Sequence, residues 1–264
     1  MKRRQLLEIA DEGWCPALIR DFATDYLEQA ITVANAYEPI VERLQKAVKL
    51  AQAGRVIDLC SGGGGPWRQM EKSFTKYCPE VSIYLTDRHP NGGTQRRVQQ
   101  MTGEIIKFHP DSINALRVPP ELRGFRTLFS SFHHFKPAEA QAIIRAAVES
   151  RNGIGIFEGT QRHPRALLVM LLIPLVVWLL TPKIRPFRWS RLLWTYLIPV
   201  VPFVVFFDGI VSCLRTYTVE ELKKFAAEYA ASNYEWEIGE VKARHSLVPV
   251  TYLIGYPAAH TKGI

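Results

Sequence analysis

The sequence has few cysteines, and those it has form no recognisable motif. Cys15, Cys60, Cys78 and Cys213 are scattered through 264 residues, with no Cys-x-x-Cys pair and no neighbouring histidine at metal-ligand spacing. This pattern excludes the usual zinc sites and disulfide frameworks, and it favours a reducing compartment. The N-terminus also lacks the apolar core of a secretory signal. We therefore expect a cytoplasmic protein that holds no metal.

Acidic residues are scarce in one part of the chain. Between residues 161 and 215, seven lysines and arginines stand against one acid, Asp208, so this stretch carries +6 of the formal net charge of +8. These charges flank the most apolar part of the sequence. Basic residues beside apolar segments are attracted to anionic membrane surfaces. A nucleic-acid groove would more often interleave its charges with single aromatic residues along one face. We therefore expect no nucleic-acid partner.

The order of helical and strand-like patterns predicts the fold class. An N-terminal helical stretch, divided by Pro39, precedes strands that alternate with helices, which is typical of βαβ units and a parallel sheet. Two final β-type runs, 234–241 and 248–256, are joined too closely for a crossover and must be antiparallel. The sequence thus predicts an α/β protein with the following segments: helices at 16–52, 66–77, 94–101, 137–150 and 219–231, and strands at 56–59, 81–86, 104–108, 126–130 and 153–157.

A glycine-rich turn after the first strand is the most informative feature. Residues 56–67 run from a strand through four glycines towards a helix, which lets the backbone approach a nucleotide-like ligand closely. Trp67 stands where a dinucleotide fingerprint needs its third glycine, and no Gly-Lys-Ser/Thr follows for a P-loop. Asp58 would repel a phosphate but favours an ammonium group. Asp87 can bind ribose hydroxyls, and Asp111 can receive an adenine amino group, so the set matches S-adenosylmethionine (SAM).

The same residues resemble the class I SAM-dependent methyltransferases. Residues 58–64 correspond to motif I, 85–87 to the ribose motif, 111–112 to the adenine motif and 130–135 to the segment after the fourth strand. The family usually has glycine where Cys60 stands. The resemblance implies a Rossmann-like, seven-stranded, mostly parallel sheet with an antiparallel last strand, and SAM as cofactor. The cofactor-binding residues that it implies are Asp58, Cys60, Ser61, Gly62, Gly63, Gly64, Asp87, Arg88, Asp111, Ser112, Ser130, Ser131 and Phe132.

The resemblance also suggests how the chain is divided. Residues 54–160 would form the SAM-binding core, and residues 216–264 would complete it with a helix and the antiparallel pair of strands. Residues 1–53 would be an N-terminal helical lid, and residues 161–215 an inserted hydrophobic helical hairpin. Trp14 and Tyr26 in the lid are candidates to close over the site, although such aromatics more often pack helices together.

Methyl transfer needs alignment of the reacting atoms and, for some acceptors, removal of a proton. His133 and His134 follow the fourth strand and are the candidates to take that proton; the alternative is that one bonds backbone while the other packs with neighbouring phenylalanines. Glu158, which ends the fifth strand, is a weaker candidate for substrate contact and could instead cap a loop. Asp208 is expected either to pair with Arg215 or to orient a substrate.

Two apolar runs, 166–180 and 192–207, form the expected hairpin. The first contains fifteen residues with Pro174 at its middle; at about 1.5 Å per residue it is shorter than the roughly 30 Å of a bilayer core. The segment 166–207 is therefore either an interfacial hairpin, peripheral at the inner face of a membrane, or a soluble cap over a substrate pocket or against a second subunit in a homodimer. Both interpretations predict a small hydrophobic acceptor.

Other uses of the same fold stay open. An enzyme with this fold could instead use SAM in another reaction, in which the aminoalkyl chain of SAM is cyclised or cleaved and methylthioadenosine is released. A non-catalytic, membrane-associated protein could keep only the binding site. RNA methylation is disfavoured, because Ser-Phe-His-His follows the fourth strand, where an RNA methyltransferase would have a motif that binds a base flipped out of its stack.

Overall fold

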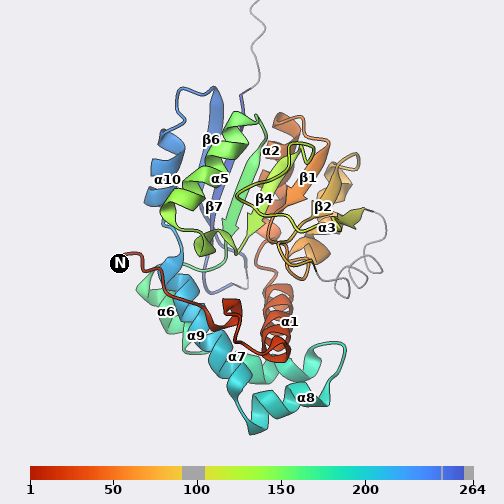
Figure 1. The fold of residues 1–264 in the computed structure, drawn as a ribbon, viewed down its shortest axis with the longest axis vertical. Helices are drawn as coiled ribbons and strands as arrows, with labels where there is room; N and C mark the ends of the chain where they lie inside the picture. The colour runs from red at the N-terminus through yellow and green to blue at the C-terminus, as the bar shows by residue number, and fades with distance from the viewer. Residues whose placement is uncertain (91–104, 245, 259–264) are drawn as a thin grey trace, which may run out of the picture.

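The computed structural model describes residues 1–90, 105–244 and 246–258. A seven-stranded sheet with the strand order β3-β2-β1-β4-β5-β7-β6 forms its centre (Figure 1). The pairs from β3 to β5 are parallel, whereas β7 runs antiparallel to both β5 and β6. This arrangement confirms the predicted Rossmann-like sheet. The strands are β1 (Arg55–Asp58), β2 (Ser82–Leu85), β3 (Ile106–Phe108), β4 (Phe125–Phe129), β5 (Ile154–Glu158), β6 (Tyr234–Val241) and β7 (Val250–Pro257).

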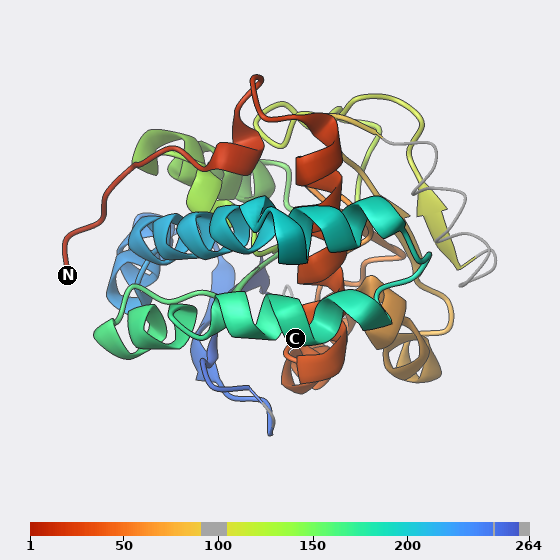
Figure 2. The ribbon, with the colours of Figure 1, turned by 90° about the horizontal axis from the view of Figure 1, so that it is seen from below.

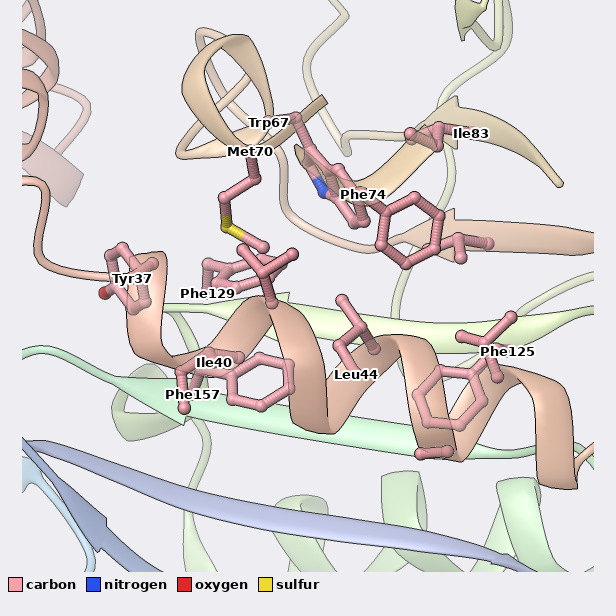
Figure 3. Packing of buried hydrophobic residues seen from close by; sticks show 14 of the residues in the cluster. Tyr37, Ile40, Leu44, Trp67, Met70, Phe74, Ile83, Phe125, Phe129 and Phe157 are labelled. Atoms are coloured by element: carbon pink, nitrogen blue, oxygen red, sulfur yellow. The ribbon is translucent and has the colours of Figure 1, made fainter. Parts of the chain in front are cut away.

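Helices cover both faces of the sheet. α2 (Val41–Leu50) and α3 (Trp67–Tyr77) pack on one face, and α5 (Pro137–Glu149) and α10 (Val219–Ala227) pack on the other. Figure 3 shows Leu44 of α2 facing the phenylalanines of β4 and β5, with the aromatic side chains of α3 beside them. Because α2 is amphipathic, its apolar side chains recur every three or four residues and turn towards the sheet.

A third group of helices lies at one end of the sheet (Figure 1). This helical layer lies beyond the carboxyl ends of β4 and β5, because α6 follows β5 and the short helix η3 (Phe132–His134), which follows β4, contacts α9. Figure 2 shows the α6–α7 and α8–α9 segments side by side, with α1 crossing them. The layer consists of α1 (Ala17–Ala34), α6 (Pro164–Met170), α7 (Ile173–Leu180), η4 (Thr181–Lys183), α8 (Trp189–Leu192), the π-helix η5 (Leu193–Leu197) and α9 (Val200–Arg215).

Prolines divide the apolar hairpin into short helices. Pro174 stands in the first turn of α7, and Pro199 directly precedes α9, positions where a missing backbone N–H costs no helical hydrogen bond. Within the described residues, each helix is too short or too polar to cross a membrane by itself. Two bent pairs reach the length and composition of a span only when joined: Pro164–Met170 with Ile173–Lys183, bent by 42°, and Trp189–Leu197 with Val200–Arg215, bent by 72°.

The N-terminal part of the chain contacts both the helical layer and the sheet. α1 packs in the helical layer, whereas the short helix η2 (Glu38–Ile40) leads into α2 on the face of the sheet. Residues 1–16, which include the short helix η1 (Ile9–Asp11), run along α9, and the Arg4 amide donates to the Leu214 carbonyl over 3.1 Å. The expected helix at 94–101 lies outside the described residues, and the division of the chain into domains stays a prediction.

Candidate functional site

The glycine loop after β1 has the backbone conformation that its sequence predicts. Gly62, Gly64 and Gly65 have φ values of +51°, +101° and +52°, in the left-handed region that favours glycine. Cys60 also has a positive φ, +58°, which explains why a glycine would be the easier residue at this position. The loop folds back on β2, since the Ser61 amide donates to the Thr86 carbonyl over 3.0 Å.

Asp58 lies buried beneath this loop. It is 1% exposed, and its Oδ1 accepts a hydrogen bond of 2.6 Å from the Thr127 hydroxyl of β4. Burial raises the pKa of Asp58 to about 6, although the hydrogen bond from Thr127 opposes the rise. A buried carboxylate with no cation beside it is costly. The position therefore suits a ligand that brings a positive charge to the loop.

Asp87 and the segment after β3 border the same loop. The Asp87 carboxylate accepts from the amides of Gly62, over 2.9 Å, and His89, over 2.8 Å. The Ser112 hydroxyl donates to the Arg88 carbonyl over 2.6 Å, which ties the segment after β3 to the segment after β2. The side chain of Asp111 is 81% exposed. Because β1, β2 and β3 are parallel neighbours, their carboxyl ends, with all three predicted aspartates, share one edge of the sheet.

Ser130 and Ser131 follow β4, at the centre of this edge. Ser130 has a φ of +45°, and its hydroxyl bonds to the Tyr37 hydroxyl over 2.5 Å and accepts from the Gly159 amide over 3.2 Å. Ser131 is buried beside Cys60. Burial and the charges of Asp87 and Asp58 raise the pKa of the Cys60 thiol to about 12. The thiol is therefore neutral near pH 7.

His133 is held between two carboxylates. Its Nδ1 lies 2.7 Å from Glu158 Oε2, and its Nε2 lies 3.5 Å from Glu8 Oε1. Burial lowers the pKa of His133, but the charges and hydrogen bonds of Glu158 and Glu8 outweigh it and raise the pKa to about 9. An imidazole that already holds its proton at neutral pH is a poor proton acceptor. These surroundings argue against the predicted role of His133 as a base.

His134 has a different environment. Its Nδ1 lies 2.9 Å from Asp11 Oδ2, its ring lies against that of His133 with centroids 4.3 Å apart, and its side chain is 31% exposed. Its other ring nitrogen, Nε2, lies 3.8 Å from Glu8 Oε2, so His134 also faces two carboxylates but is more exposed than His133. Neither Asp11 nor Glu8 is recognisable from the sequence, because both lie in the N-terminal segment, far from the histidines along the chain.

The structure shows which partners Asp208 and Glu158 have. Asp208 does not pair with Arg215: it accepts from the amides of Ile9, over 2.6 Å, and Ala10, over 3.0 Å, at the start of η1. Arg215 instead contacts Glu8, with Nη1 3.2 Å from Oε1. Glu158 is 1% exposed and accepts from the amides of Phe132 and His133, which agrees with the alternative that it caps the loop after β4.

The two aromatic residues of the predicted lid also play other roles. Tyr26 is 2% exposed in the core of the helical layer, and Trp14 is 69% exposed. α1 instead reaches the glycine loop through Glu28, since a Cβ placed on Gly63 would lie 1.6 Å from Glu28 Oε1. The close approach brings the helical layer over the loop, and a side chain at this position would require the end of the Glu28 side chain to move.

One cluster has the spacing of metal ligands. Glu8, His133 and His134 each place one ligand atom within 4.8 Å of the others. The guanidinium of Arg215 lies beside the same Glu8 carboxylate, and it also donates to the carbonyls of His133, over 3.4 Å, and His134, over 3.1 Å. Arg215 thus supplies a positive charge beside the Glu8 carboxylate of this cluster.

Comparisons with protein-family models and with curated proteins find no match. Among solved structures, the plantazolicin methyltransferase BpumL, in complex with SAH, is similar with a TM-score of 0.50 and 8% identity, over 91% of this chain and 98% of that one. Human N-acetylserotonin methyltransferase in complex with SAM has a TM-score of 0.49 and 11% identity, over 94% of this chain and 59% of that one. An O-methyltransferase family protein from Burkholderia thailandensis has a TM-score of 0.46 and 15% identity, over 91% and 63%.

This chain therefore spans about six-tenths of the length of the latter two proteins. At such low identities the likeness concerns the fold alone. The fold is that of the class I SAM-dependent methyltransferases.

Proposed function

We propose that this protein is a SAM-dependent methyltransferase that acts on a small hydrophobic acceptor. The observation that carries the proposal is the convergence of Asp58, Asp87 and the glycine loop at one edge of the sheet. Asp58 offers a buried negative charge to an ammonium group, and Asp87 offers carboxylate oxygens to ribose hydroxyls. The set contains acceptors for a zwitterionic nucleoside and no cradle for a phosphate.

SAM supplies a methyl carbon that is electrophilic because it is bonded to a sulfonium. The protein must hold the acceptor in line with that carbon and, for a hydroxyl or amine acceptor, take up one proton. His134 fits this second task, because Asp11 orients its ring and its side chain is partly exposed. His133, protonated between Glu8 and Glu158, holds η3 in position.

The helical layer supports a hydrophobic acceptor. It lies over the carboxyl end of the sheet, where the acceptor must meet the methyl group, and a buried apolar cluster fills the space between α1, α7 and α9, while Arg191 and Arg215 are buried beside it. An acceptor with a large apolar surface would be stabilised by contact with this layer.

Titration calorimetry with SAM and with S-adenosylhomocysteine tests the donor site. Asp87→Ala is expected to weaken binding of both by at least about tenfold, the cost of losing charge-assisted hydrogen bonds. Glu80→Ala is the matched control, because this exposed carboxylate precedes the same strand at its opposite end. No heat with either ligand would contradict the proposal. Mass spectrometry of the turnover product separates methyl transfer, which gives S-adenosylhomocysteine, from cleavage to methylthioadenosine.

A further inference from the structure

Large hydrophobic side chains remain exposed on the helical layer. We call the exposed side chains of residues 164–207 the apolar face. Their exposed fractions include 64% for Leu168, 63% for Leu179, 78% for Trp189, 76% for Leu197 and 57% for Phe203. The elements that carry them lie together at the end of the molecule away from the sheet (Figures 1 and 2). Exposed apolar side chains that extend over α6 to α9 are more than the scattered single residues usual on a protein surface, and such a patch indicates an interaction site.

The charges beside this face have one sign. Residues 164–207 contain no aspartate or glutamate. Lys183 and Arg185 are exposed and Arg188 is partly exposed, all in the connector between α7 and α8. Arg191 does not contribute, since it is buried and paired with Asp25. The face is therefore apolar with a cationic connector, which is the complement of an anionic, amphipathic surface.

A second copy of this chain fits the face less well than a lipid surface does. In a two-fold dimer the same patch meets itself, and residues 164–207 of either copy offer no carboxylate to pair with the cationic connector of the other. A bilayer rich in anionic headgroups neutralises the same charges. Trp189 and Tyr196, exposed by 78% and 46%, are the residue types that lie at the boundary between headgroups and hydrocarbon.

We propose that the apolar face docks the protein on an anionic lipid bilayer, with the helical layer in the plane of the interface. The bent helix pairs suit this position, because each helix is short and its inner side is already buried against α1 and its neighbours. Lys183, Arg185 and Arg188 contact the headgroups, while the leucines and Trp189 enter the upper acyl region. The docking does not depend on the proposed methyl transfer.

Vesicle flotation of the full chain tests the proposal. The chain is expected to float with vesicles of equal parts phosphatidylcholine and phosphatidylglycerol, and much less with phosphatidylcholine alone. The triple variant Lys183→Gln/Arg185→Gln/Arg188→Gln is expected to bind the anionic vesicles about 100-fold more weakly, at roughly fivefold for each charge. Its matched control is Lys46→Gln/Lys49→Gln/Lys76→Gln on α2 and α3, also three exposed charges, which is expected to bind like the unsubstituted chain.

A second pair of variants tests whether the exposed apolar side chains contribute to membrane binding. Leu179→Ser/Trp189→Ser/Leu197→Ser is expected to abolish flotation, whereas Leu50→Ser/Tyr77→Ser, exposed at the other end of the molecule, is expected to preserve it. Should the first variant fold poorly, lipids brominated in the acyl chain give an independent measure. They should quench the tryptophan fluorescence of the unsubstituted chain, and Trp189→Phe should lose part of that quenching.

Three results would overturn the proposal. The first is failure of the unsubstituted chain to bind anionic vesicles. The second is equal binding by the basic triple variant and its control. The third is a dimer, measured by light scattering, that the apolar triple variant dissociates and that does not bind vesicles, because the face would then belong to a second copy. None of these results bears on SAM binding, so the two proposals fail separately.

Discussion

The two sides of the helical layer differ in whether their basic side chains are buried and paired or exposed. On the side that faces the sheet and α1, Arg162, Arg191 and Arg215 are buried, and each is paired with a carboxylate of another segment. On the outer side, Lys183 and Arg185 are exposed beside leucines and tryptophans. Residues 161–215 contain seven basic residues, but three of them are buried and form ion pairs inside the protein. A local excess of charge therefore does not indicate how much charge a surface offers to a partner.

The largest expected effect tests this difference on two arginines three residues apart. Arg191, whose side chain is 2% exposed, also donates to the Pro186 carbonyl over 3.0 Å. Arg191→Ala should lower the free energy of unfolding by about 3–5 kcal/mol, because it leaves the Asp25 charge without this partner. Arg188→Ala, in the partly exposed position, should change it by less than about 0.5 kcal/mol. Urea denaturation of both variants measures the contrast, and equal losses would show that the two sides do not differ.

The inner side should also respond to pH through His133. Its pKa is about 9 in the folded protein, against 6.5 for the unperturbed group. The protonated ring therefore stabilises the fold fully below pH 6.5, and this stabilisation, about 3 kcal/mol, should be lost as the pH rises to 9. His133→Gln should flatten that part of the stability profile, and His89→Gln, an exposed control, should not. An unchanged slope in His133→Gln would mean that another group titrates.

Two apolar residues on α7 allow the inner and outer sides of the helical layer to be compared within one helix. Val177 is 0% exposed in the core of the layer, and Leu179 is 63% exposed. Val177→Ala should lower the free energy of unfolding by about 2 kcal/mol through loss of packing, and Leu179→Ala should lie within about 0.5 kcal/mol of the unsubstituted chain. Thermal denaturation in the absence of lipid measures both. A large loss in Leu179→Ala would indicate that the outer side is covered in solution.

The smallest effect concerns Asp58, the buried carboxylate at the sheet edge, which has no ion pair among the residues that the structure describes. Its pKa is about 6 in the free protein, and an ammonium group beside it would favour the ionised form. Affinity for S-adenosylhomocysteine should therefore rise with pH through 6, by about tenfold between pH 5 and pH 7. Asp58→Asn should abolish this dependence, and Asp111→Asn should retain it. Calorimetry across this range would refute the assignment if both variants kept the dependence.

Local patterns predicted that the aspartates would lie together at one edge of the sheet. Asp58 and Asp87 each follow a parallel strand, and neighbouring parallel strands end at one edge, so their convergence follows from the order of elements. The partners of the histidines could not be predicted in this way. Glu8 and Asp11 lie in an irregular N-terminal segment whose path along α9 has no signature in the sequence. The assignment of Asp208 to Arg215 failed for the same reason, since the amides that Asp208 accepts from belong to that segment.

The sequence by itself determined the α/β architecture, the antiparallel closing strands and the glycine loop, because periodicity, turn residues and short connections act between near neighbours. The tertiary structure alone decided which charges are buried, what pairs with them and therefore which histidine holds its proton. Those properties depend on distances between segments that lie 25 to more than 150 residues apart in the sequence, and the pKa of a buried group is set by the charges that folding brings within a few ångströms.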